Sequence, residues 1–409
     1  MKAPALELAG IFRIHAPAYL EAFGDSLSAQ QKRALREIPL CRTAALGGYV
    51  EECDHCGHRN IAYRSCRNRH CPKCQAATRA EWLERRAAEL LPVEYFHVVF
   101  TLPDRLAPLA LHNQRVVYAI LFRAASETLL RIAADPKHLG AKIGFLAVLH
   151  TWGQNLHHHP HLHCVVPGGG IAPDHSRWIA CRQHFLLPVK VLSRLFRAKF
   201  VTYLKRAFHR EGLRFHGELQ LLAEEKNFIA WLNETARSEW VVYAKPPFGG
   251  PQQVLKYLAR YTHRVAITNQ RLLSVQDGAV TFRWKDYSHG SRLTTMTLAV
   301  NEFIRRFLLH VLPSGFVKIR HFGFLANRRR QEDIALCRKL LAPRSEMEQQ
   351  LPTSPEPSVT RRPQPTPVDR CPLCKVGRMN RVEIFLPQAS VIAGSCSPFL
   401  AAALVWNTA

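Results

Sequence analysis

The segment HPHLHCVVPGGG, residues His159–Gly170, predicts the centre of the fold. Its β-branched residues and its closing glycines are typical of a strand that ends in a turn. Successive side chains of a strand point to opposite faces, so His161 and His163 share one face while Leu162 faces the core. Two imidazoles on one face form half of a site for a divalent metal ion. We therefore predict a sheet that carries a histidine pair suited to metal binding.

A third metal ligand must come from elsewhere in the chain. Gln154 and His159 are the candidates that lie nearby in sequence. We favour Gln154, because a tight turn between adjacent strands could bring it opposite the histidine pair. A histidine-rich stretch can also occur without binding a metal ion. The prediction of a catalytic metal therefore depends on the other motifs of the chain.

The surrounding sequence alternates between strand and helix patterns. Further strands are expected at Glu94–Pro103, Gly144–Gly153, Glu239–Lys245 and Ala279–Tyr287, the last after the turn signal Asp277-Gly278. Helical patterns occupy much of residues 1–48, 76–91, 108–134, 188–210, 251–266 and 300–312. Strands and helices intermix, so the fold class is α+β.

A cysteine-rich segment precedes these elements. In CDHCGHRNIAYRSCRNRHCPKC two CxxC pairs are separated by 14 residues. Paired CxxC motifs at this spacing are typical of one tetrahedral, structural Zn2+. We expect its ligands to be Cys53, Cys56, Cys71 and Cys74. Competing or additional ligands are Cys66, His55, His58 and His70, which leaves a second metal open.

A third CxxC pair, Cys371 and Cys374, stands near the C-terminus. This pair supplies half of the ligands of a zinc site. A partner chain or a histidine could supply the rest, or the site could remain incomplete. The Pro-rich, polar stretch before it, residues 343–370, is expected to be an extended linker. The remaining segments are a helical and zinc-binding domain at 1–90, a catalytic domain at 91–342 and a C-terminal tail at 371–409.

Two tyrosines lie one helical turn apart in KYLARYTHR. Tyr257 and Tyr261 share a helix face, but they also belong to an amphipathic stripe that core packing alone would explain. Taken alone, the stripe favours core packing. Basic residues beside the hydroxyls strengthen the case for contact with phosphate; they are Lys256, Arg260 and Arg264. A tyrosine phenolate can attack a phosphodiester and become a covalent phosphotyrosine. A divalent ion can polarise that phosphate, so the tyrosine and histidine elements together indicate DNA strand transfer.

The net charge supports a polyanionic partner. Fifty-six basic against 31 acidic residues give +25. This charge indicates nucleic acid or an anionic membrane surface. We see no signal peptide and no uninterrupted apolar stretch long enough to cross a bilayer, so we expect a cytoplasmic protein without membrane contact. In that compartment cysteines bind metal more often than they form disulfides.

The order of these motifs resembles a known family. HPHLHCVVPGGG is similar to the His-hydrophobe-His motif of the HUH endonucleases. The order SCRNRHCPKCQ, FTLP, HPHLHCVVPGGG, YLARYTHR and IRHFGFLAN, over about residues 10 to 342, resembles the rolling-circle transposases of bacterial insertion sequences, the IS91 group.

The resemblance implies a five-stranded antiparallel sheet with flanking helices, preceded by a zinc-binding domain. It implies Mg2+- or Mn2+-dependent nicking of single-stranded DNA at element ends, with a 5′-phosphotyrosine and a free 3′-OH as products. Matching residues would be His161 and His163 as metal ligands and Tyr261 and Tyr257 as nucleophiles. Such a protein would work in the bacterial cytoplasm, at the nucleoid.

Two alternatives stay open from the sequence. A plasmid rolling-circle replication initiator or relaxase would use the same histidines and tyrosine without needing this cysteine module. A non-enzymatic, zinc-dependent DNA-binding regulator would use neither Tyr257 nor Tyr261.

Overall fold

A computed structural model describes residues 6–245, 253, 265–286, 292–342 and 370–387, without the side chains of 76–81 and 245. Its helices are α1 (Leu8–Phe23), α2 (Ala29–Glu37), α3 (Pro72–Ala87), α4 (Ala107–His112), α5 (Gln114–Ala134), α6 (Val189–His209), α7 (Glu225–Arg237), α9 (Val300–Leu308) and α10 (Arg330–Leu341). Its strands are β1 (Gly48–Cys53), β2 (Arg59–Tyr63), β3 (Tyr95–Thr101), β4 (Gly144–Trp152), β5 (His158–Pro167), β6 (Gly169–Ile171), β7 (Trp178–Ala180), β8 (Val242–Lys245), β9 (Leu272–Gln276), β10 (Ala279–Asp286), β11 (Arg292–Ala299), β12 (Ile319–Gly323) and β13 (Met379–Phe385).

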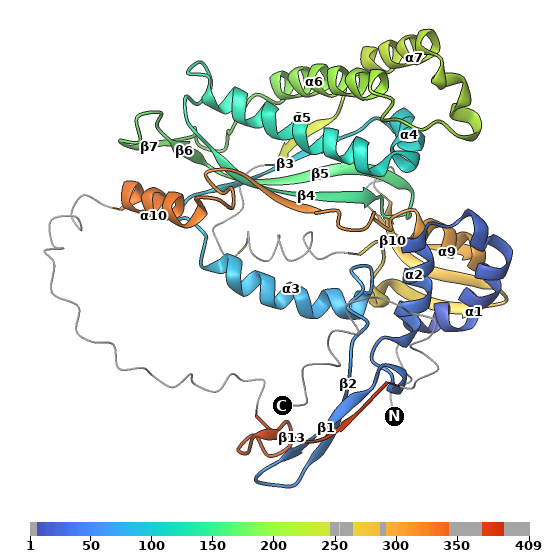
Figure 1. Cartoon of the computed structure of the whole chain (residues 1–409). Helices are drawn as coiled ribbons and strands as arrows, with labels where there is room; N and C mark the ends of the chain where they lie inside the picture. The colour runs from blue at the N-terminus through green and yellow to red at the C-terminus, as the bar shows by residue number, and fades with distance from the viewer. Residues whose placement is uncertain (1–5, 246–252, 254–264, 287–291, 343–369, 388–409) are drawn as a thin grey trace, which may run out of the picture.

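The centre of the fold is a five-stranded antiparallel sheet in the order β12-β4-β5-β3-β8. The expected α+β class and the five-stranded sheet are therefore confirmed. β5 lies between β4 and β3, so the histidine segment occupies the middle of the sheet (Figure 1). A central strand is fixed on both edges by backbone hydrogen bonds, which makes it a rigid support for a functional site.

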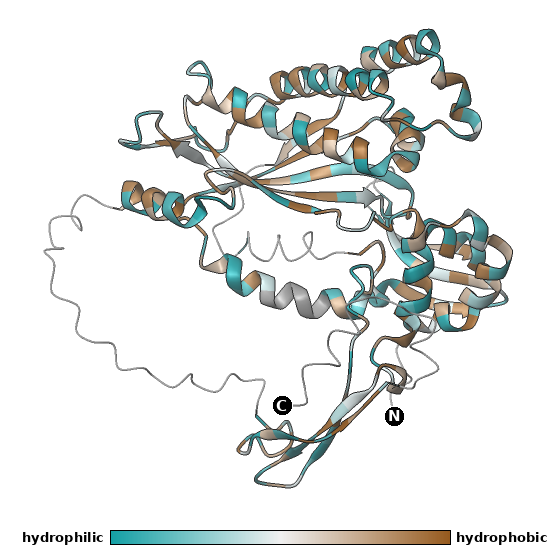
Figure 2. Ribbon diagram, viewed as in Figure 1, coloured by the Kyte–Doolittle hydropathy of each residue, from teal (hydrophilic) through white to brown (hydrophobic). Residues whose placement is uncertain are grey.

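One face of this sheet packs under α4, α5 and α6. Phe100, Leu162 and Val166 point into this core, and all three are buried. Figure 2 shows largely hydrophobic central strands, whereas α5 and α6 alternate hydrophobic and hydrophilic residues as amphipathic helices do. Because side chains alternate along a strand, burying Leu162 turns His161 and His163 to the opposite face.

The opposite face is covered in part by α3. Val148 and Val165 pack there against Trp82 and Leu83 of α3. Val148 lies opposite His163 in the strand register, so this apolar contact ends where the histidines begin.

A second core joins segments that are far apart in sequence. The rings of Phe12 in α1 and Phe307 in α9 meet edge to face, with centroids 5.1 Å apart. A sheet in the order β11-β10-β9 completes this core, and the expected hairpin turn has φ of 50° at Asp277 and 70° at Gly278. The same core therefore contains residues from both sides of the expected domain boundary at residue 90.

A third sheet unites the two ends of the described chain. β13 pairs with β1 in the order β13-β1-β2, with Gly48 opposite Phe385 and Cys53 opposite Met379. In Figure 1 the red strand β13 lies along the blue strand β1, away from the central sheet. The C-terminal segment is thus a strand of the N-terminal zinc-binding region.

Candidate functional site

Three histidines of the two central strands bring their ring nitrogens together. His150 on β4 pairs in register with His161 on β5, and His163 lies two residues further along the same face. One ring nitrogen from each lies within 4.8 Å of the other two. His150 and His163 are buried and His161 is partly exposed, so a ligand can approach from the side of His161.

Hydrogen bonds fix the rings of the two β5 histidines. The carbonyl oxygen of His159 can only accept, so Nδ1 of His161, 2.7 Å away, donates and carries the proton. Nε2 of His161 is then the ring nitrogen that can offer a lone pair to a metal ion. Nδ1 of His163 lies 2.7 Å from Nε2 of His97 on β3, and this contact leaves Nε2 of His163 directed at Nε2 of His161.

The spacing of these two nitrogens fits a shared metal ion. Nε2 of His161 and Nε2 of His163 lie 3.1 Å apart. Two ligands at right angles, each about 2.1 Å from one ion, are about 3 Å apart. Nitrogens of neutral imidazoles held by hydrogen bonds on their other ring atom are the usual arrangement for histidine ligands.

The third imidazole comes from a residue that the sequence reasoning missed. Gln154 lies in the turn between β4 and β5, where its backbone carbonyl oxygen accepts a hydrogen bond from Nη2 of Arg271 at 2.5 Å. His150 joins the cluster instead, while Gln154 as a ligand stays a prediction. His150 is identified as a candidate ligand by the pairing of β4 with β5, which places it opposite His161. The sequence around His150 contains no motif that indicates metal binding.

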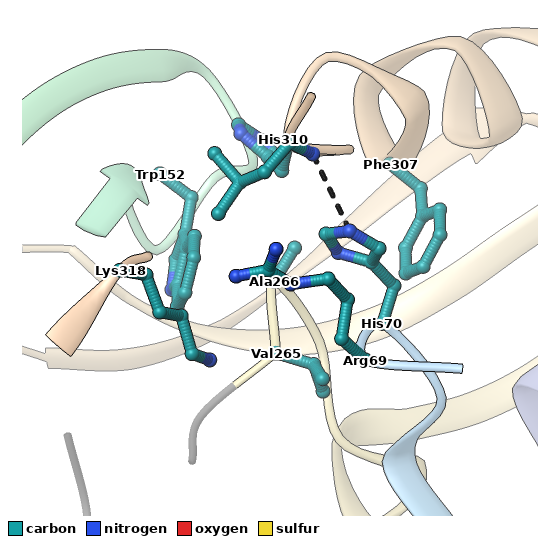
Figure 3. A pocket seen from close by; sticks show the side chains of 9 residues that line it. Arg69, His70, Trp152, Val265, Ala266, Phe307, His310 and Lys318 are labelled. Atoms are coloured by element: carbon teal, nitrogen blue, oxygen red, sulfur yellow. Dashed lines mark hydrogen bonds between the residues drawn. The ribbon is translucent and has the colours of Figure 1, made fainter. Parts of the chain in front are cut away.

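A basic pocket adjoins the histidine cluster. Trp152 stacks on His150 with ring centroids 4.6 Å apart and planes 19° apart. Trp152 also helps to line a pocket into which Arg69 and Lys318 extend from different segments (Figure 3). The other described residues that line it are His70, Val265, Ala266, Phe307, His310 and Leu312.

Burial dominates the electrostatics of this pocket. Burial, with the nearby Arg69 charge, lowers the pKa of Lys318 to about 7. Burial likewise lowers the pKa of His310 to about 3. His70 accepts a hydrogen bond at Nε2 from the backbone N–H of Leu312 at 3.3 Å, which fixes it beside Arg69. Desolvation and repulsion between neighbouring basic groups destabilise the protonated forms of Lys318 and His310. A pocket of this kind favours binding of an anion.

The cysteines form two clusters of four. The first joins Cys41, Cys66, Cys71 and Cys74. Cys74 Sγ lies 3.5 Å from Cys41 Sγ and 3.6 Å from Cys66 Sγ. Tetrahedral Zn2+ with bonds of about 2.3 Å holds its sulfurs about 3.8 Å apart, so these four thiols fit zinc. Hydrogen bonds from Cys66 and Cys71 lower the pKa of Cys41 to about 7, towards the thiolate that a metal requires.

The second cluster joins Cys53, Cys56, Cys371 and Cys374. Cys53 Sγ lies 3.7 Å from Cys374 Sγ, and Cys56 Sγ lies 3.6 Å from Cys371 Sγ. The expectation that Cys53, Cys56, Cys71 and Cys74 share one ion is therefore corrected. Each CxxC pair has a different partner, because β1 carries the first pair to the C-terminal segment while Cys71 and Cys74 begin α3 beside Cys41.

The predicted nucleophiles and their basic neighbours lie outside the described residues; they are Tyr257, Tyr261, Lys256, Arg260 and Arg264. The described chain resumes at Val265, which lines the basic pocket.

Two family models match the segments that carry these clusters. A family model described as "Putative transposase" matches residues 144–332, which include the histidine cluster. Another, described as "Transposase zinc-binding domain", matches residues 11–102 and includes the first cysteine cluster. The "Putative transposase y4qJ" of Sinorhizobium fredii (strain NBRC 101917 / NGR234) is 56% identical over 389 residues, 93% of this chain and 95% of that protein. The chain belongs to the IS91-type transposases.

A more distant relative supports the same membership. The transposase is 28% identical over 291 residues to the "Transposase for insertion sequence element IS801" of Pseudomonas savastanoi pv. phaseolicola, covering 70% of this chain and 68% of the relative. No solved structure matches the transposase. DNA is the polyanion on which transposases act, which accounts for the charge of +25. Among the described residues, no helix combines the length and apolar character needed to cross a membrane.

Proposed function

We propose that this transposase nicks and rejoins single-stranded DNA at the ends of its element, in rolling-circle transposition. The observation that carries the proposal is the three-imidazole cluster on the two central strands, with two Nε2 atoms 3.1 Å apart. An imidazole cluster that is partly exposed at His161, in a chain that acts on DNA, suits a metal ion that contacts a phosphate.

His161, His163 and His150 would hold Mg2+ or Mn2+, with Gln154 as a further candidate ligand. When bound, the ion would polarise the scissile phosphate and stabilise the negative charge that develops on it. The protein's own part is to hold the imidazoles in place through the His159 carbonyl and His97.

The phenolic oxygen of Tyr261 or Tyr257 would supply the nucleophile. It attacks the phosphorus, a tyrosyl–phosphate bond forms, and the bond to the 3′ oxygen of the preceding nucleotide breaks. The phenol loses its proton and the departing 3′ oxygen gains one, so a 5′-phosphotyrosine and a free 3′-OH result. Attack of a 3′-OH on the phosphotyrosine reverses these steps and joins strands.

The basic residues beside the tyrosines would hold the DNA strand. Lys256, Arg260 and Arg264 would contact backbone phosphates, which supply affinity without reading sequence. The zinc ion would be structural, since four thiolates leave no position open for substrate. We place this activity in the bacterial cytoplasm, at the nucleoid.

A cleavage assay tests the proposal. Wild-type protein and the variants Tyr257→Phe/Tyr261→Phe and His161→Ala are incubated with labelled single-stranded DNA from an element end, with Mg2+ or Mn2+. We expect cleavage by the wild type only, while His161→Ala still binds DNA. Equal cleavage by the double tyrosine variant would contradict the tyrosine mechanism, and full activity of His161→Ala would contradict the metal site.

A further inference from the structure

The second cysteine cluster contains two backbone turns of the same form. The N–H of Gly57 donates to the carbonyl of Cys53 at 3.1 Å, and the N–H of Lys375 donates to the carbonyl of Cys371 at 2.9 Å. The residue after each CxxC has a left-handed conformation, with φ of 68° at Gly57 and 60° at Lys375. Two equivalent turns that face each other present four sulfurs to one point.

Close packing and hydrogen bonds hold the two turns together. A Cβ on Gly377 would lie 2.5 Å from Cys53 Sγ, so this approach requires a glycine. The N–H of Gly377 donates to Cys374 Sγ at 3.4 Å, and the N–H of His55 donates to Cys53 Sγ at 3.4 Å. The N–H of Arg378 donates to Oδ1 of Asp54 at 2.7 Å. Backbone N–H groups directed at sulfur stabilise thiolates, which are the form that binds metal.

We propose that Cys53, Cys56, Cys371 and Cys374 bind a second structural Zn2+ that ties the C-terminal segment to the N-terminal zinc-binding region. Sulfur separations of 3.6 and 3.7 Å match the edges of a tetrahedral zinc–thiolate site and far exceed the about 2.05 Å of a disulfide. The ion closes the chain over more than 300 residues and holds β13 against β1.

Zinc stoichiometry tests this site on the full chain. We expect two zinc ions per wild-type chain and one per chain for Cys371→Ser/Cys374→Ser. Cys181→Ser, which alters a cysteine outside both clusters, should keep two. One zinc in the wild type, or two in the double variant, would overturn the proposal.

A cleavable linker adds a test whose decisive arm uses the wild-type sequence of both cysteine clusters. A protease site is placed within residues 343–369 of the intact protein, and the chain is cut after purification. The piece from residue 370 onward should stay bound in the wild type and be released from Cys371→Ser/Cys374→Ser. Release from the zinc-loaded wild type would contradict the proposal.

The basic pocket beside Trp152 supports a separate inference. Arg69 comes from the zinc-binding region, Lys318 precedes β12, and Val265 follows the segment that contains the tyrosines. Figure 3 shows Arg69 and Lys318 entering the pocket between these walls. Three segments thus place two cationic groups next to the tryptophan that stacks on His150.

We infer that Arg69 and Lys318 bind a backbone phosphate of the DNA strand next to the one at the histidine cluster. The guanidinium offers a fork of donors and the lysine a point charge, which together suit a phosphate. This inference rests on the proposed function for the identity of the strand, but not for the binding itself.

Neutral phosphate analogues locate the contact. Single-stranded DNA with one uncharged methylphosphonate at successive positions is titrated by fluorescence anisotropy without divalent metal, so that cleavage is not needed. We expect one position next to the nick site at which neutralisation weakens wild-type binding by about tenfold. Arg69→Gln and Lys318→Met should bind every DNA of the series more weakly than the wild type does. At that one position, neutralising the phosphate should not weaken their binding further. Arg237→Gln, an exposed arginine on α7, should behave as wild type.

The outcomes separate this inference from the proposed function. Undiminished sensitivity of both pocket variants at that position would overturn the phosphate contact, even if the wild type cleaves. A wild type that shows the sensitive position but forms no covalent product would leave the contact intact and refute the nicking mechanism. Because Arg69 lies between Cys66 and Cys71, retained zinc content verifies that its variant is folded.

Discussion

Nε2 of His97 lies 2.7 Å from Nδ1 of His163, with the two rings nearly parallel at 14°. His97 comes from β3 and His163 from β5, and both are buried. The contact positions a proposed metal ligand from the side away from the ion. Second partners of this kind set the tautomer and ring orientation of histidine ligands.

Replacing His97 should therefore weaken metal binding without removing a ligand. We expect His97→Phe to lower Mn2+ affinity by about 10- to 100-fold, measured by calorimetry on the full chain. His97→Asn, which keeps a hydrogen-bonding group, should recover part of the loss. Unchanged affinity in His97→Phe would show that the hydrogen bond does not position His163.

The third ligand can be identified by a paired comparison. His150→Ala should abolish metal-dependent cleavage and weaken Mn2+ binding, because a ligand directed at the ion is lost. Gln154→Ala should retain both if His150 fills that place alone. The reverse pattern would restore Gln154 as the third ligand and leave His150 as a packing residue under Trp152.

Acid should destabilise the protein through His310. Its folded pKa of about 3 lies below the usual value near 6.5, so the unfolded chain takes up the proton first as pH falls. The stability that this group contributes is present above about pH 6.5 and is lost progressively down to about pH 3. Between pH 6.5 and 5 the loss is about 2 kcal/mol, from about 1.4 kcal/mol per pKa unit.

Urea unfolding of wild type and His310→Gln measures this contribution. The difference in unfolding free energy between the two proteins should change with pH over that window, because only the wild type can protonate residue 310. A parallel pH dependence in both would assign the acid sensitivity elsewhere, for example to His158, whose pKa burial lowers to about 4.

Cys66 belongs to the first cysteine cluster although it lies outside any CxxC motif, so replacing it should destabilise the protein. Cys66→Ser should lose one zinc ion and lower the melting temperature, since the cluster packs against the core that contains α1. Cys181→Ser should melt as the wild type does. A normal melting temperature and zinc content in Cys66→Ser would show that the cluster is not a metal site.

Local pattern predicted β3, β4, β5 and β8 of the central sheet, but not the edge strand β12. Alternation in β5 predicted that His161 and His163 share a face, and the β-branched run before Pro103 predicted β3. Both follow from neighbours in sequence, which fix side-chain direction within a strand. His150 was missed because its place depends on the pairing of two strands.

The zinc ligands likewise depend on contacts between segments that are distant in sequence. Cys41 and Cys66 lie outside any CxxC motif, and Cys371 lies over 300 residues from Cys53. Spacing within a motif predicts a pair of ligands but not which pair joins it. That choice is made by β1, which pairs with β13, and by α3, whose first turn meets Cys41.

The most direct test of the proposed mechanism is the chemical identity of the covalent intermediate. Wild-type protein trapped on single-stranded DNA from an element end is digested, and the peptide that carries nucleotide is sequenced by mass spectrometry. We expect a 5′-phosphate linked to Tyr261 or Tyr257, which forms with Mg2+ or Mn2+ and is absent in His161→Ala. Cleavage of the DNA with no protein-linked nucleotide, or linkage to a different residue, would contradict it.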